Sequence, residues 1–264
     1  MKKAVVLAAM GILLLSACSV LRGAPVGNPA KPVVELNYNP YKVSAEIDLV
    51  KERALDYAGT DREIDHLNWY LTRLSYVHED WVEFYILLGM VDDGEFTTAV
   101  KYETGTGFAW GLGQTILLHE FENGLKVGMD ARYRQTEPDV DKLTTGAVGY
   151  SINDANVSGV EVEIKEWHLA LGISRELDGP VEITQFIPFG WILMPYAGIK
   201  YSDVDIDSQS TIAGTSNKSS GVGSDDNVGL FLGCDVLAAD NASFGIEMRF
   251  LDEIAYSVNF SYRF

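Results

Sequence analysis

Four histidines are the side chains in this sequence best suited to proton transfer near neutral pH. They are His66, His78, His119 and His168. Asp65 and His66 are adjacent, but no second acidic pair is recognisable beside them, and no Ser–His pair is recognisable around any of the four histidines. We therefore expect the histidines to be structural or surface residues, and the sequence predicts no catalytic site and no enzyme.

Metal binding is the second chemistry to consider. Asp203, Asp205 and Asp207 have the alternate spacing of an oxygen-rich loop, but the glycine and the bidentate glutamate of an EF-hand are missing. Cys18 and Cys234 are the two cysteines, too few for a zinc cluster or a disulfide framework. We expect the three aspartates to be solvated charge beyond a strand end, and we expect no metal and no cofactor.

The first 17 residues predict an export signal. Lys2 and Lys3 precede an apolar run, residues 4–17, that is too short to span a bilayer. Residues 15–18 fit a lipobox, in which Cys18 would be lipidated and become the mature N-terminus; ordinary cleavage after Ser19 is the alternative. Residues 18–40 are rich in proline and glycine, which predicts an extended linker with no helix or sheet of its own.

From Tyr41 to the end, apolar and polar residues alternate in segment after segment, which predicts β-strands. Ten such segments can be counted, and eight is the alternative if the first is spurious and one other merges. Short turns are expected at 78–80, 122–124, 238–242 and 252–253. Longer polar loops are expected at 51–65, 92–106, 136–159 and 203–226.

The last strand has the clearest pattern. One parity is wholly apolar and the other small or polar; the apolar members are Ile254, Tyr256, Val258, Phe260, Tyr262 and Phe264. This strand resembles the C-terminal strand of bacterial outer-membrane β-barrels. In that family the terminal Phe and the alternate aromatics are the signal read by the barrel assembly machinery. The resemblance implies that Tyr256, Val258, Phe260, Tyr262 and Phe264 form such a signal.

The resemblance also implies an all-β fold, in which residues 41–264 form one antiparallel, up-and-down transmembrane β-barrel in the outer membrane. Residues 18–40 would then be a periplasmic linker. Alternating strands also account for a mean hydropathy of only +0.03 in a membrane protein. The short turns and the longer loops would lie at opposite ends of the barrel, with the loops outside the cell.

If the strands close into a barrel, their polar parity faces the lumen. The charged candidates for the lumen are Arg73, Glu83, Lys126, Asp130, Arg132, Glu166, His168, Lys200, Asp235, Glu247, Arg249 and Arg263. Acids and bases nearly balance in this set, and an unpaired ion in a narrow lumen is costly. We therefore predict paired charges and a largely plugged interior.

The net charge of −18 and the pI of about 4.5 argue against nucleic-acid binding, which needs a basic face. We expect a structural or surface-interaction role, in which a barrel surrounded by outer-membrane lipid presents acidic loops to an extracellular ligand that the sequence does not name. Three alternatives stay open: a porin-like channel for small solutes, an outer-membrane hydrolase, and a soluble periplasmic lipoprotein with a β-sandwich.

Overall fold

The computed structural model describes residues 26–29, 39–57, 60–98, 100–145, 148–177, 192–239 and 242–264. The predicted export signal, Cys18 and most of the predicted linker lie outside these residues. The strands are β1 (Tyr41–Tyr57), β2 (Thr60–His78), β3 (Val82–Thr97), β4 (Lys101–Glu120), β5 (Leu125–Thr145), β6 (Val148–Ser151), β7 (Val157–Arg175), β8 (Ile192–Ile212), β9 (Thr215–Ser224), β10 (Val228–Ala239), β11 (Ala242–Phe250) and β12 (Ile254–Arg263). A short 3₁₀ turn, η1 (Glu79–Trp81), joins β2 to β3.

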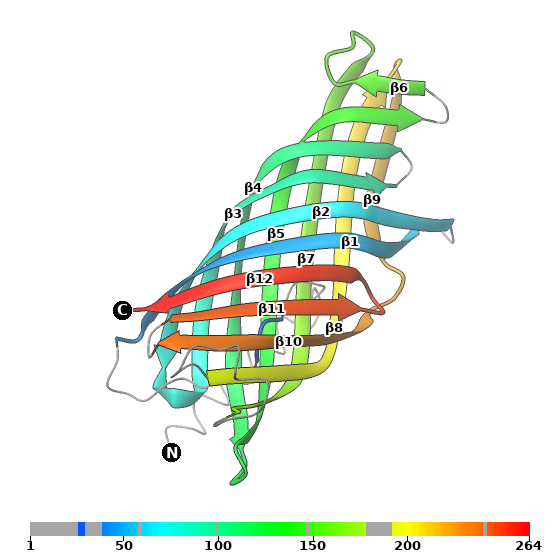
Figure 1. The fold of residues 1–264 in the computed structure, drawn as a ribbon. Coiled ribbons are helices and arrows are strands. Elements are labelled where there is room, and N and C mark those ends of the chain that lie inside the picture. Colours follow the sequence, from blue (N-terminus) through cyan, green and yellow to red (C-terminus); the bar gives the residue numbers. More distant parts are fainter. Residues whose placement is uncertain are drawn as a thin grey trace, which may run out of the picture.

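Ten of these strands form a closed antiparallel ring, in the order β1-β2-β3-β4-β5-β7-β8-β10-β11-β12 (Figure 1). The last strand pairs back onto the first over a register that runs from Lys42↔Arg263 to Glu52↔Ile254. Closure leaves the ring without free edges, which is what a sheet within lipid requires. The predicted up-and-down barrel of about ten strands is confirmed.

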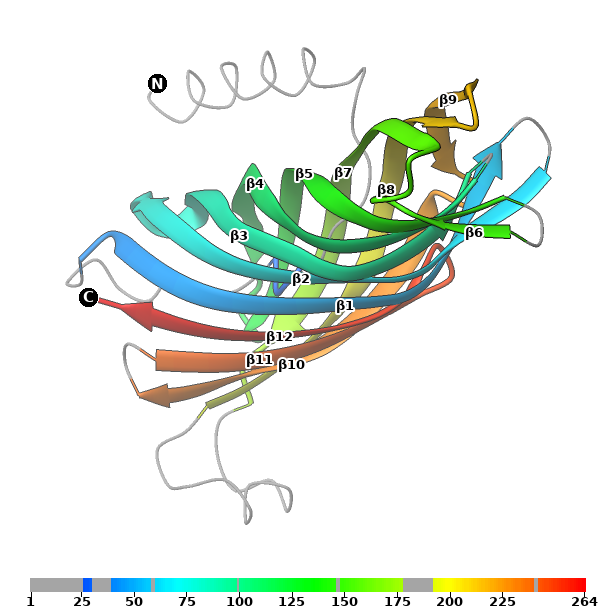
Figure 2. The ribbon, with the colours of Figure 1, turned by 90° about the horizontal axis from the view of Figure 1, so that it is seen from above.

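The wall of the barrel is much taller on one side than on the other (Figures 1 and 2). β10, β11 and β12 have 12, 9 and 10 residues, whereas β4, β5 and β8 have 20, 21 and 21. Beyond the turn between β11 and β12, the longer strands continue and β9 takes the place of the three short ones. β9 pairs with β8 along its length and touches β1 at Leu55↔Ser224 and Asp56↔Gly223.

The barrel therefore consists of a ten-stranded section and, stacked on it, an eight-stranded section made of β1, β2, β3, β4, β5, β7, β8 and β9. We define the eight-stranded section as residues 50–68, 91–107, 136–165 and 202–226, as far as the structure describes them. It lies at the end away from Tyr41 and from the C-terminus (Figure 1).

The four segments that were predicted to be long loops are largely strand, and that prediction was wrong. Residues 203–212 continue β8, and residues 215–224 form β9. The alternation continues there with its polarity exchanged: Val204 and Ile206 are buried, while Asp205 and Asp207 are only partly so. Asp203 was also predicted to be solvated, and that prediction was wrong: it is 1% exposed and accepts a hydrogen bond from the Ser224 N–H at 2.7 Å. Acidic residues on every second position gave these strands the composition of a loop.

The outer wall of the ten-stranded section is apolar. Its exposed large side chains include Ile47, Tyr70, Leu74, Phe84, Ile86, Leu88, Met90, Phe108, Trp110, Leu112, Leu169, Leu171, Ile173, Ile199, Tyr201, Leu232, Phe244, Ile246, Met248, Tyr256, Val258, Phe260, Tyr262 and Phe264. Two aromatic pairs lie where this apolar wall meets the eight-stranded section. The ring centroids of Trp110 and Tyr133 are 5.7 Å apart, and those of Trp167 and Tyr201 are 6.0 Å apart. Girdles of this kind are typical at membrane interfaces.

Candidate functional site

The interior of the ten-stranded section holds most of the buried charge of the molecule, in two groups. The upper ion layer lies at the border with the eight-stranded section, to which Arg53 belongs. It consists of Asp48, Arg53, Arg134, Glu166, Lys200, Glu247, Arg249, Asp252 and Glu253, each at most 2% exposed. The lower ion layer, nearer the start of β1 and the end of β12, is built on Lys42, Glu46, Arg73, Glu83, Tyr85, Thr115, Asp130, Arg132 and His168.

Arg249 on β11 is the hub of the upper ion layer. Its guanidinium contacts Asp48 at 2.5 Å, Glu253 at 2.6 Å and Glu247 at 3.3 Å. Asp48 lies on β1, across the barrel seam, and it also accepts a bond from Arg134 at 2.8 Å. A fork of five N–H donors suits Arg for bridging several carboxylates in this way.

The turn between β11 and β12 closes the upper ion layer from above. Leu251 adopts a φ of 87°, and the next two side chains, Asp252 and Glu253, are both 2% exposed. Lys200 reaches Asp252 at 2.9 Å and also pairs with Glu253. Arg53 joins Glu253 at 3.3 Å to Glu166 at 3.1 Å, which ties the turn to β1 and β7.

Asp130 and Tyr85 are the centre of the lower ion layer. The Asp130 carboxylate lies 2.6 Å from Nε2 of His168 and accepts hydrogen bonds from the hydroxyls of Thr115 at 2.6 Å and Tyr85 at 3.1 Å. The Tyr85 hydroxyl in turn accepts a bond from Nε of Arg132 at 3.1 Å. The imidazole of His168 is fully buried. The hydrogen bonds around Asp130 and Tyr85 therefore form a structural network that fills this part of the lumen.

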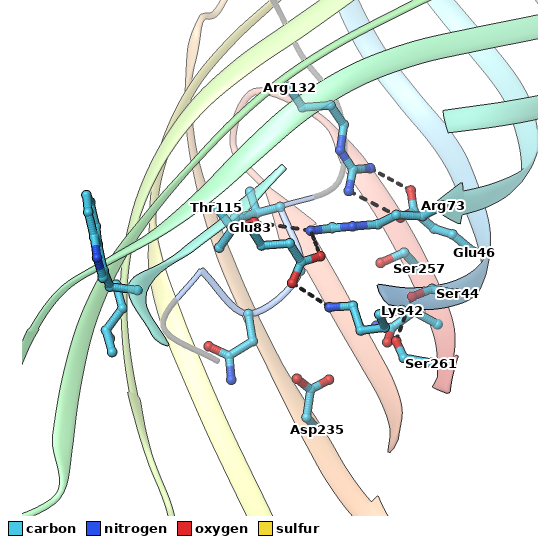
Figure 3. A pocket seen from close by; sticks show the side chains of 16 residues that line it. Lys42, Ser44, Glu46, Arg73, Glu83, Thr115, Arg132, Asp235, Ser257 and Ser261 are labelled. Atoms are coloured by element: carbon cyan, nitrogen blue, oxygen red, sulfur yellow. Dashed lines mark hydrogen bonds and ion pairs between the residues drawn. The ribbon is translucent and has the colours of Figure 1, made fainter. Parts of the chain in front are cut away.

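The rest of the lower ion layer lines a small cavity near the start of β1 and the end of β12. Figure 3 shows Arg73 and Lys42 pointing toward Glu83, and Arg132 pointing toward Glu46. The nitrogen–oxygen distances to Glu83 are 2.8 Å from Arg73 and 2.6 Å from Lys42, and Arg132 lies 2.6 Å from Glu46. The guanidinium of Arg73 also lies flat over the Tyr85 ring, 3.5 Å from its centroid. The cavity has a volume of about 50 Å³ for the centres of water molecules, which is room for a few waters only.

Of the residues that were predicted to face the lumen, Glu166, Lys200, Glu247 and Arg249 lie in the upper ion layer, and Arg73, Glu83, Asp130, Arg132 and His168 lie in the lower one. Asp235 is 1% exposed and lines the cavity. Two lie at the mouth of the barrel. Lys126 pairs with Glu176 at 2.5 Å, and Arg263 is only partly buried and donates its Nε proton to the Asn39 carbonyl at 3.1 Å.

Several members of the ion layers were missed from the sequence. Glu46, Asp48 and Arg134 stand on the polar parity of their strands, so alternation could have found them. Arg53 could not be found, because a register shift between Val50 and Glu52 changes which side chains of β1 point inward. Asp252 and Glu253 occupy a turn, where a polar dipeptide normally predicts exposure.

The interior of the eight-stranded section is a hydrophobic core. It includes Leu55, Ile64, Leu67, Phe96, Tyr102, Val140, Leu143, Val162, Ile164, Val204, Ile206 and Val222, which are 0–8% exposed. Phe96 and Tyr102 stack at 5.3 Å with their planes 14° apart. Trp69 marks the border with the upper ion layer, where the Arg134 guanidinium sits 3.8 Å above its ring.

His66, which follows Asp65 in the sequence, lies on the outside of the eight-stranded section. Its Nε2 is 3.3 Å from Asp93, whose side chain is 73% exposed. Nearby, Lys101 pairs with Glu95 and lies 3.9 Å from Asp65. Partial burial, and then a hydrogen bond to Glu95, raise the pKa of Asp65, while the Lys101 ammonium lowers the pKa of Glu95. Within the described residues no group of His, Cys, Asp and Glu is arranged to hold a metal ion.

In the described part of the chain, no helix has the length and apolar character needed to cross a membrane. No protein-family model and no curated protein matches the sequence.

Three solved structures illustrate what the chain is similar to. They are the beta domain of the Bordetella autotransporter BrkA (13% identity, TM-score 0.46, covering 86% of this chain and 100% of that one), the translocator domain of the autotransporter NalP from Neisseria meningitidis (10%, 0.45, 100% and 98%) and the outer membrane protease OmpT from Escherichia coli (10%, 0.41, 87% and 99%).

The fold of this chain is given by the hydrogen-bonded ring itself. A closed ring of strands with an apolar outer wall, an aromatic border and a charged interior is how transmembrane β-barrels are built. By its own strand pairing and surface, the chain has the architecture of a bacterial outer-membrane β-barrel.

Proposed function

We propose that the protein is a closed outer-membrane barrel whose role is to hold its eight-stranded section at the cell surface for structural or surface-interaction purposes. The observation that best supports this role is that side chains fill the interior of the barrel. Each cation of the upper ion layer has a carboxylate within 4 Å, and the hydrophobic core lies directly above it. Ions would have to break a buried charge network and then cross a packed apolar region, and both steps are costly.

The outward face of the eight-stranded section supports a surface role. Its exposed or partly exposed acids include Glu52, Glu63, Asp65, Asp93, Glu95, Glu103, Glu137, Asp139, Asp141, Glu161, Glu163, Asp205 and Asp207. Basic residues on the same face are fewer, for example Lys51, Lys101, Lys142, Lys165 and Lys218. A rigid acidic sheet of this kind attracts cationic partners and repels anionic ones.

Conductance in planar lipid bilayers separates this function from a porin-like channel. We expect the purified full chain to insert without steady, discrete current steps. Steps of the size that general porins produce would overturn the closed-barrel proposal and favour solute passage.

Labelling of intact cells tests which end faces outward. Ala213→Cys, at the β8–β9 turn, should react with a membrane-impermeant maleimide. Glu122→Cys, at the turn between β4 and β5 on the opposite end, is the matched control and should react only after lysis. Both positions are exposed. The reverse pattern of labelling would mean that the eight-stranded section faces the periplasm.

The closing strand supports a second part of the proposal, recognition by the barrel assembly machinery. The alternate side chains of β12, from Tyr256 to Phe264, are 40–59% exposed on the apolar wall while β12 seals the seam with β1. Deleting Phe264 should lower the amount of folded protein in the outer membrane but leave export intact. Normal outer-membrane levels of that variant would contradict this role.

An outer-membrane hydrolase is the second candidate function, and one observation favours it. The His66–Asp93 pair and the Asp65–Glu95 carboxyl pair lie on the same outer surface of β2 and β3. A His–Asp pair can act as a general base when a substrate is bound beside it. Cleavage of peptides or of lipid A by the wild type, abolished in His66→Ala, would establish this activity. Absence of cleavage leaves the surface role.

A further inference from the structure

Residues 26–29 precede the first strand in the chain, yet they lie inside the barrel. Val26 is 1% exposed and packs against Ala170 of β7, Tyr196 of β8 and Phe231 of β10. Its backbone N–H donates a hydrogen bond to Oε1 of Glu247 on β11 at 3.2 Å. One residue thus contacts four neighbouring strands from within the lumen.

The next residues continue this contact with the wall. The side-chain amide of Asn28 donates a hydrogen bond to the Ser174 hydroxyl of β7 at 3.2 Å, and Asn28 is 8% exposed. The Pro29 ring lies against Gly172, so close that a Cβ added to this glycine would come within 2.7 Å of the Pro29 Cγ. Gly27, at a φ of 67°, provides the bend between the two contacts.

The wall is shaped to receive this segment. A Cβ at Gly198 would come within 2.5 Å of the Phe231 ring, and a Cβ at Gly233 would come within 2.3 Å of the Tyr196 ring. These glycines let the two rings lie down against the strands. The result is a shallow apolar recess, formed by Ala170, Tyr196 and Phe231, beside the charged groups of the two ion layers.

We propose that this recess is a docking site for the chain's own residues 26–29, and that the segment acts as an internal plug of the barrel. The plug covers the apolar recess, caps Glu247, and forms one side of the cavity lined by Lys42, Arg73 and Glu83. It therefore restricts access to the lower ion layer from the mouth where β1 begins and β12 ends. This inference does not depend on the proposed surface function, because it concerns the opposite end of the barrel.

Accessibility of engineered cysteines tests the plug. Ser174→Cys and Ser257→Cys, each in a chain that carries Cys234→Ala, place thiols beneath the segment: Ser174 contacts Asn28, and Ser257 lines the same cavity as Val26. The reagent is a bulky, membrane-impermeant maleimide applied to the purified, folded full chain. The chain without an engineered cysteine measures the background.

We expect slow labelling at both positions while Val26 is present. Labelling should be at least tenfold faster when Val26→Asp places a carboxylate in the apolar recess of Ala170, Tyr196 and Phe231. Val26→Ile keeps the apolar contact and should keep the protection. Replacing residues 26–29 by four serines should accelerate labelling as Val26→Asp does. This second variant leaves the strands untouched.

Retention of the folded, heat-modifiable band in gels shows that the barrel itself is intact in each variant. Equal labelling rates in the parent and in the four-serine variant would overturn the proposal, because they would mean that the segment does not occupy the lumen in solution.

Discussion

The ten-stranded and eight-stranded sections share strands, but the polarity of their inner and outer faces is reversed. In the ten-stranded section the apolar side chains face outward and buried ions fill the interior. In the eight-stranded section the acids face outward and the interior is aliphatic and aromatic. β8 shows both arrangements in one strand: Lys200 points inward below the border, and Ile206 points inward above it.

The difference shows that the surrounding solvent, rather than the backbone, selects the polarity of each face. The alternation of β7 and β8 continues across the border without a register shift, from Trp167↔Asp203 to Ile164↔Ile206. Below the border the outer face meets lipid, and polar side chains have a lower free energy in the lumen, where they can pair with one another. Above it the outer face meets water, and burial of apolar surface provides the stability as in a soluble protein.

The largest effect should come from breaking the upper ion layer. Arg249→Met removes the cation that contacts Asp48, Glu247 and Glu253, and it leaves these carboxylates with fewer partners in a buried site. We expect the free energy of unfolding to fall by about 4 kcal/mol. Guanidinium titration in lipid vesicles measures it. Arg263→Met, at the mouth, is the control and should change it by less than about 0.5 kcal/mol.

A smaller loss is expected from a cavity in the hydrophobic core. Ile206→Ala should cost about 3 kcal/mol, because Ile206 is fully buried and the space it leaves cannot collapse. Ile199→Ala, on the outer face of the same strand, should cost clearly less, since lipid chains fill the gap. Equal losses in vesicles would mean that position 199 is not in contact with lipid.

A charge added to the outer face should destabilise the ten-stranded section but not the eight-stranded section. Ile199 is 53% exposed on the apolar wall, and Ile199→Lys should destabilise the folded barrel by about 2 kcal/mol, since it lies near the edge of the belt. Gln209→Lys, exposed on the same strand in the eight-stranded section, should have almost no effect. A large effect at position 209 would place that part of β8 inside the bilayer.

The smallest effect concerns pH. The Lys101 ammonium holds the pKa of Glu95 below its usual range, so this carboxylate contributes stability above the pKa it has in the unfolded chain, and that contribution is lost as the pH falls through the lower, folded value. The raised pKa of Asp65 acts in the opposite direction over the same acidic range.

Because the cluster is partly exposed, we expect less than about 1 kcal/mol between pH 7 and pH 3. The difference between wild type and Glu95→Gln in urea titrations should therefore shrink as the pH is lowered. A difference that stays constant with pH would mean that the Glu95–Lys101 contact does not form in solution.

Sequence alternation alone was sufficient for the membrane-facing wall. Trp110, Trp167, Phe244 and the apolar residues of the closing strand were assigned to the outer face of a barrel of about ten strands. The structure has these residues exposed there, except for Trp167, which is half-buried. A period of two is a local property of each strand, so no knowledge of its neighbours is needed to detect it.

The strands of the eight-stranded section were missed because the apolar face of every strand was expected to point outward. Asp203, Asp205 and Asp207 were expected in a loop, although Val204 and Ile206 between them carry the signal of a strand. Acids on one face and aliphatic residues on the other are what a water-exposed sheet requires, and this criterion would have extended β8 to its observed end.

What the sequence by itself determined is which side chains of the membrane strands face lipid and which face the lumen, because that depends only on neighbouring positions along one strand. Only the tertiary structure decided the partners in the lumen. Asp48 and Arg249 are 201 positions apart, and they meet because β12 closes against β1. Arg53 and Glu253 join them through a register shift in β1 and an inward-folded turn. Such contacts depend on closure and register, which arise only when all strands pair at once.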